Sequence, residues 1–102
     1  MSALALKQLN SSKPYIAAQG AMMCVVEGHA SQEEASAILK LSSFDDTTYR
    51  VAGRTLHDWM LAALDVLGIK KCEEPEKSDV WGLIEMMKDP AWINDMKTVL
   101  PR

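Results

Sequence analysis

Apolar residues recur along most of this chain at the three- and four-residue steps that are typical of amphipathic α-helices. The first strongly patterned segment, Tyr15–Val26, contains Gln19 as its only polar residue and follows Pro14, a residue favoured at the first helical position. Gly28 is the residue type that most often ends a helix. A helix that is apolar on nearly every side must be buried on several sides. We therefore predict a buried helix over Tyr15–Val26, in preference to a short buried strand.

Two further helices are expected to follow. Ser31 and Glu34 have the spacing of a capping box, in which each side chain bonds the other residue's backbone N–H. The inner stripe of this helix is expected to comprise Ala35, Ile38, Leu39 and Leu41. A third helix is expected to start at Ser42 or Ser43 and to end at Gly68, with the longest stripe in the chain: Tyr49, Ala52, Leu56, Trp59, Met60, Ala63 and Leu67. Such a pair forms either a helix-turn-helix or a plain helical hairpin.

The remainder of the chain divides into a charged loop and two shorter helices. Residues 70–77 are charged and contain a proline, which predicts an exposed loop. Ser78 and Asp79 then open a helix with the inner residues Val80, Trp81, Ile84 and Met87. Asp89–Pro90 starts a last helix, which runs through Trp92, Ile93 and Met96 to Leu100. Residues 1–13 are polar and weakly patterned, so we expect them to be flexible. The fold class predicted is all-α, a small orthogonal domain of about five helices over residues 14–102 that forms an intertwined or helix-packed dimer.

Composition agrees with one globular domain. The chain has 102 residues, of which 48% are hydrophobic and 25% charged. It contains no run long enough for a transmembrane helix and no signal-peptide core, so we expect a cytoplasmic protein. Cys24 and Cys72 are too few for a disulfide framework and are expected to fill apolar space.

The charge balance and the absence of motifs restrict the chemistry. Acidic residues outnumber basic ones by 14 to 11, whereas a chain that binds nucleic acid alone is usually basic. Contact with DNA would require a local basic cluster or a basic partner. The soft metal-ligand candidates are Cys24, His29, His57 and Cys72, and none has the spacing of a zinc site. No glycine-rich phosphate loop is present. We therefore expect a protein that is not an enzyme and binds neither metal nor cofactor.

The run from Glu33 to Leu64 resembles the central part of FlhD, the D subunit of the bacterial flagellar master regulator. The family pattern of Ala-Ser-Ala, two apolar residues, a basic residue and leucine is matched by Ala35 to Leu41. Ser42 stands where the family has a glycine. Further matches are the acidic pair Asp45 and Asp46, the pair Thr55 and Leu56, and, in the preceding helix, Tyr15, Ile16, Ala18 and Gln19. FlhD-like subunits of conjugative plasmids and integrative elements fit the pattern as well.

The resemblance implies an all-helical subunit that dimerises and joins an FlhC-like protein, so that the hetero-oligomer binds promoter DNA and activates flagellar or conjugative-transfer genes. It makes Lys40, Arg50 and Arg54 candidates for DNA contacts, the alternative being solvated surface charges. The candidate subunit interface consists of Tyr15, Met22, Met23 and Val26, the alternative being the core of the chain itself. Cys72, close to a cysteine of the family, is the candidate for an interchain disulfide. A second functional hypothesis is a small helical interaction module, such as a phage or plasmid inhibitor or a secretion chaperone, without DNA contact.

Overall fold

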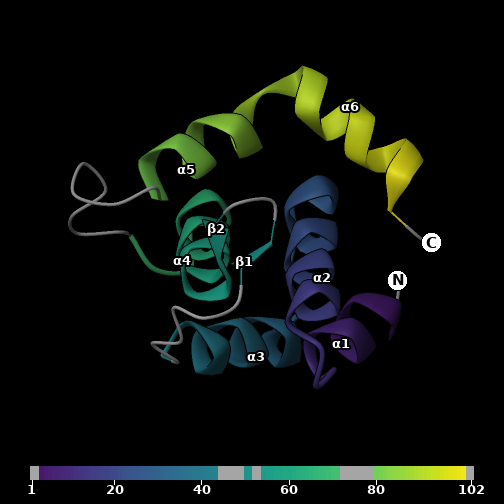
Figure 1. The fold of residues 1–102 in the computed structure, drawn as a ribbon, viewed down its shortest axis with the longest axis vertical. Coiled ribbons are helices and arrows are strands. Elements are labelled where there is room, and N and C mark those ends of the chain that lie inside the picture. Colours follow the sequence, from purple (N-terminus) through teal and green to yellow (C-terminus); the bar gives the residue numbers. More distant parts are fainter. Residues whose placement is uncertain (1–2, 44–49, 52–53, 72–79, 101–102) are drawn as a thin grey trace.

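Helices make up most of the chain in a computed structural model, which describes residues 3–43, 50–51, 54–71 and 80–100. The helices are α1 (Ala3–Leu9), α2 (Pro14–Glu27), α3 (Gln32–Ser42), α4 (Leu56–Val66), α5 (Val80–Lys88) and α6 (Pro90–Val99). Figure 1 shows α2 and α4 side by side, α1 and α3 across one end of them, and α5 and α6 arching over the other. The predicted all-α class is thereby confirmed. No helix among the described residues is both long and apolar enough to cross a membrane.

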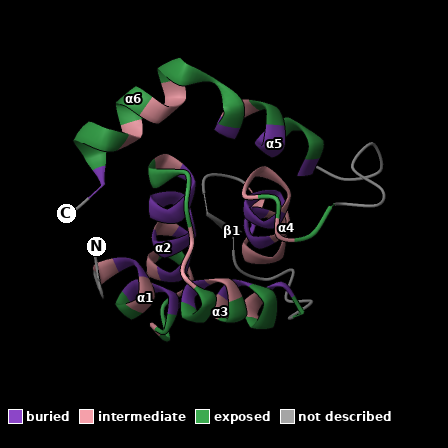
Figure 2. Cartoon of the chain, turned by 180° about the vertical axis from the view of Figure 1, so that it is seen from behind, coloured by how far each residue is buried: buried purple, intermediate pink, exposed green. Residues whose placement is uncertain are grey.

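The central helix is α2, and its burial is achieved within the chain. It contacts α1, α4 and α6, and the purple segments of α2 in Figure 2 mark its buried residues. The structure differs here from the expectation that residues 1–13 are flexible, because α1 buries Ala5 and Leu9 against α2. Gly20 allows this close contact, since a Cβ at Gly20 would lie 2.8 Å from the carbonyl oxygen of Ala5. The apolar character of α2 therefore requires no partner chain.

The connection between α3 and α4 differs from the predicted short turn. Residues 43–55 separate the two helices and include a two-stranded antiparallel ladder of β1 (Arg50–Val51) and β2 (Arg54–Thr55). Tyr49 and Ala52 of the predicted stripe lie outside the described residues. Helix α4 begins at Leu56, where the side chain of Thr55 accepts a hydrogen bond from the backbone of Asp58 at 3.2 Å. This arrangement contradicts a short-turn helix-turn-helix.

Most of the helix boundaries predicted from the sequence are confirmed, and one is wrong. The capping box is confirmed: the backbone N–H of Ser31 donates to Glu34 Oε1 at 2.7 Å, and that of Glu34 donates to Ser31 Oγ at 3.1 Å. Gly28 ends α2 with a left-handed φ of 71°, and Gly68 follows α4 with a φ of 74°. The predicted N-cap at Ser42 or Ser43 is wrong, because Ser42 ends α3 and Ser43 is its C-cap.

The last helix, α6, is the least deeply packed helix among the described residues. The side chain of Asp89 caps α6 as predicted, accepting a hydrogen bond from the backbone of Ala91 at 2.9 Å, and Pro90 follows at the first helical position. Within α6 no residue is buried, although Leu100 just beyond it is only 8% exposed. Lys70 and Lys71 of the predicted charged loop are exposed, and residues 72–79, including the predicted caps, lie outside the described residues.

Candidate functional site

The residues predicted to contact DNA come from three different elements. Lys40 is exposed in the last turn of α3. Arg54 lies in β2 and is half-buried, with its Nη2 atom 3.4 Å from the position that a Cβ at Gly82 of α5 would occupy. The Nε atom of Arg54 is shielded from solvent and has no hydrogen-bond partner in the described part of the chain. Arg50 lies in β1, and its side chain is outside the described residues. Among the described side chains, Lys40 is thus the one of the three that is fully presented to solvent.

The residues predicted to form a subunit interface divide into two groups. Met22 and Met23 are 8% and 4% exposed, because α2 is covered by other helices of the same chain. The alternative of an intrachain core therefore describes them, and they offer no surface to a partner of the folded chain. Val26 is half-buried, whereas Tyr15 at the start of α2 is 51% exposed. Tyr15 remains available for an interaction.

Among the described residues, the cysteine and histidine side chains do not assemble into a reactive group. Cys24 is completely buried, and this burial raises its thiol pKa to about 12, with the negative charges of Glu34 and Glu27 acting in the same direction. The thiol is therefore protonated at neutral pH and is a poor nucleophile. His29 is exposed, and His57 on α4 is half-buried with its Nδ1 atom shielded from solvent. In the described part of the chain no three His, Cys, Asp or Glu residues are placed to hold a metal ion, and Cys72 lies outside that part.

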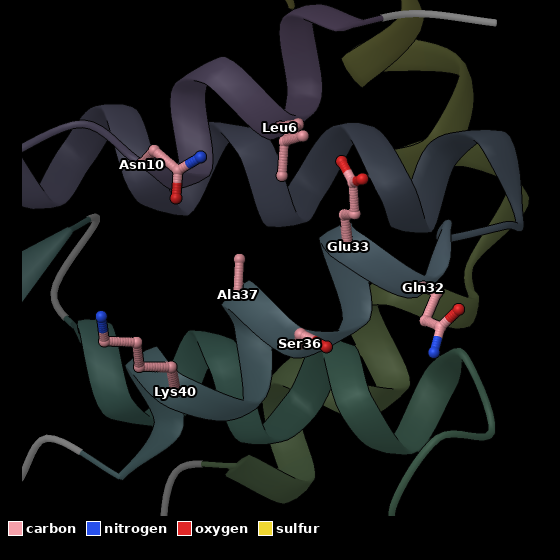
Figure 3. Close-up of a pocket in the computed structure, with 7 residues that line it drawn as sticks. All are labelled: Leu6, Asn10, Gln32, Glu33, Ser36, Ala37 and Lys40. Carbon is pink, nitrogen blue, oxygen red and sulfur yellow. The ribbon is translucent and has the colours of Figure 1, made fainter.

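An open groove of about 490 Å³ separates α1 from the outer side of α3. Figure 3 shows Leu6 of α1, Asn10 just after α1, and Glu33, Ala37 and Lys40 of α3 around the same space. The complete lining is Leu6, Asn10, Gln32, Glu33, Ser36, Ala37 and Lys40. The groove combines one carboxylate and one ammonium group with a leucine and with small and amide side chains, so it offers contacts of both charges to a helix or peptide.

A second surface lies on the outer side of α5. The sequence placed Trp81 among the inner residues, but Trp81 is 51% exposed, and Leu83 is buried with Val80, Ile84 and Met87 instead. These buried residues already complete the inner stripe at three- and four-residue steps. Trp81 lies about 100° from Val80 around the helix and therefore faces outward.

No family model, curated protein or solved structure matches this chain. The resemblance to FlhD accordingly stays a prediction from the residues, and the two surfaces are interpreted from their own geometry.

Sequence reasoning missed both surfaces, although a signal for each was present. Glu33 and Lys40 are seven residues apart with small residues between them, a spacing that places both on one helix face. Leu39, which was assigned to the inner stripe of α3, is 39% exposed on the outside of the same helix. For Trp81, the signal was the complete buried stripe that its neighbours form without it.

Proposed function

We propose that this chain is a non-enzymatic interaction subunit whose α5 surface, centred on Trp81, binds a basic partner protein. The observation that carries the proposal is the 51% exposure of this tryptophan on a helix whose inner stripe is complete without it. Tryptophan is enriched among the residues that contribute most to protein–protein binding, because its large apolar ring can be fully desolvated in a partner's pocket.

Charge around Trp81 supports the choice of a basic partner. Glu85 follows Trp81 by four residues on the outer side of α5, and Asp89, the N-cap residue of α6, is exposed just beyond the end of α5. Lys88 in the last turn of α5 is also exposed and offsets part of this negative charge. The whole chain carries a net charge of −3. A partner with an apolar pocket flanked by lysine or arginine would complement this surface, since complementary charge accelerates association and selects the partner.

The test is a capture experiment from the source cells, with partners identified by mass spectrometry. The W81A variant is expected to capture at least tenfold less of the basic partner than the wild type does. This is the effect expected from removing a central aromatic contact. Y15A is the matched control, because Tyr15 is also 51% exposed but lies on α2. Capture that is lost in Y15A and retained in W81A would place the contact on α2 and overturn the proposal.

A second candidate function is the activator subunit that the FlhD resemblance implies. Exposure of Lys40 within the matched segment Ala35–Leu41 favours it, because this lysine is free to approach a phosphate. An acidic chain would bring little of the positive charge, so an FlhC-like partner would supply most phosphate contacts.

Gel shifts on the promoter region next to the gene distinguish this candidate from the first. The activator hypothesis expects no shift with this chain alone and a salt-sensitive, sequence-specific shift with the basic partner. K40A should then weaken the shift modestly, whereas K97A, an exposed lysine on α6, should not. A chain–partner complex that ignores the DNA at low salt would contradict the activator hypothesis and leave the interaction module.

A further inference from the structure

We propose that a second copy of this chain docks antiparallel onto α3, in the groove between α3 and α1. This surface is separate from the α5 surface, so the proposal does not rest on the α5 function. It engages Lys40, and it therefore competes with the phosphate contact of the second candidate function. Glu33 and Lys40 are both exposed, and neither forms an ion pair within the described part of the chain. Both line the groove, one near each end of α3.

The spacing of these two charges makes α3 complementary to itself. Seven residues correspond to two helical turns and about 10.5 Å along the axis, so Glu33 and Lys40 share one face. Figure 3 shows both side chains directed from α3 into the groove. In an antiparallel pair, Glu33 of each copy lies opposite Lys40 of the other, and two ion pairs form around a two-fold axis. A parallel pair would instead place like charges against each other.

Small side chains occupy the point where the two helices would cross. Ser36 and Ala37 lie midway between Glu33 and Lys40 and line the groove. Small residues at a crossing point let two helix backbones approach closely, and the charged residues can then reach their partners. Leu6 of α1 lines the same groove, and Leu39 is 39% exposed beside Lys40, so apolar contacts would flank the ion pairs.

Other ligands would complement the two charges of the groove less completely. A simple anion would contact Lys40 and leave Glu33 opposing it, and a simple cation would do the reverse. The α3 helix of a second copy would pair with both charges in one register, and no further molecule would be needed. The inner side of α3 is used already, because Glu34, Ile38 and Ser42 are buried within the chain. The outer side is the surface that remains for this contact.

Charge reversal tests the proposal by sedimentation equilibrium, with the full-length chain. E33K and K40E should each weaken self-association by at least tenfold, because each reversal turns both symmetry-related ion pairs into repulsive contacts. An equimolar mixture of E33K and K40E should form a heterodimer, because the two lysines on α3 of one variant then face the two glutamates on α3 of the other. The E33K/K40E double variant should again form a homodimer, with the two charges exchanged.

Matched controls separate the contact from general charge effects and from misfolding. E85K and K97E make the same charge changes at exposed positions of α5 and α6, and they should self-associate like the wild type. Circular dichroism of each variant reports whether the helices persist, and the rescue by mixing cannot arise from unfolded chains. A wild type that stays monomeric at millimolar concentration would overturn the proposal. So would a dimer that is indifferent to E33K and K40E.

Discussion

At the scale of single residues, Gly20 is the position where the packing tolerates the least change. A Cβ there would lie 2.8 Å from the carbonyl oxygen of Ala5 and 2.8 Å from the backbone nitrogen of Leu9. Both atoms belong to the backbone of α1, so a flexible side chain cannot simply move aside. The contact explains why a glycine, which is unfavourable within a helix, occupies the middle of α2.

We predict that G20A lowers the free energy of unfolding by about 1–3 kcal/mol, because overpacking outweighs the gain of about 1 kcal/mol in helix propensity. G82A is the matched control, since its Cβ would lie 3.4 Å from Nη2 of Arg54, at the flexible end of a side chain. That variant should be neutral or slightly stabilised. Denaturant unfolding of the two variants measures the difference, and equal effects at both positions would contradict the close contact.

Residue identity predicted local contacts better than it predicted which way side chains face. The capping box of Ser31 and Glu34 and the C-cap at Gly28 depend on residues within a few positions, and both are confirmed. The orientation of Trp81 and the burial of Met22 depend on which other elements cover α5 and α2. Periodicity alone does not contain that information, because it indicates an apolar face without identifying what lies against it.

At the scale of elements, α1 is the main feature that the sequence did not predict. It has only seven residues and no acidic residue in its first turn, and helices this short are marginal in isolation. Its stability therefore comes from tertiary packing, in which Leu9 is 2% exposed and Ala5 is completely buried. A polar and weakly patterned segment can thus be an integral part of the core.

Substitution within α1 distinguishes this packing from the flexible segment that the sequence suggested. We predict that L9A lowers the free energy of unfolding by about 2–4 kcal/mol, because it removes a buried side chain from between helices. K7A on the exposed side of α1 should change the stability by less than about 0.5 kcal/mol. Thermal and denaturant unfolding measure both effects. If residues 1–13 were flexible, L9A would behave like K7A.

The segment before α4 was mispredicted for a related reason. The three- and four-residue spacing that begins at Leu56 is helical as expected, up to Val66, but the described residues before it, Arg50–Val51 and Arg54–Thr55, are strands. Val51 and Thr55 are β-branched, which favours extended backbone, and both lie in the short antiparallel ladder. Thr55 then serves as the N-cap of α4, a role that the sequence assigned to a serine.

At the scale of the whole molecule, the fold buries its apolar helix without help from a partner. The Cα radius of gyration is 12.1 Å, close to the value of about 13 Å expected for a compact single chain of this length. The original reason for expecting a dimer, an uncovered α2, is therefore removed. Self-association would instead depend on surface charges, and such contacts are weaker and more sensitive to salt than a shared apolar core.

This dependence predicts how the size of the particle responds to concentration and salt. Small-angle scattering of a dilute sample should give a radius of gyration close to that of the single chain, which is 12.1 Å over its Cα atoms. At high concentration and low salt it should rise towards about 17 Å, the value for a compact particle of twice the length. Raising the salt to 1 M should return it towards the monomer value, because the ion pairs between Glu33 and Lys40 are then screened. The E33K variant should remain near the monomer value under every condition. A radius that grows with salt would instead indicate apolar association, through exposed residues such as Trp81, and would contradict a dimer held by charge on α3.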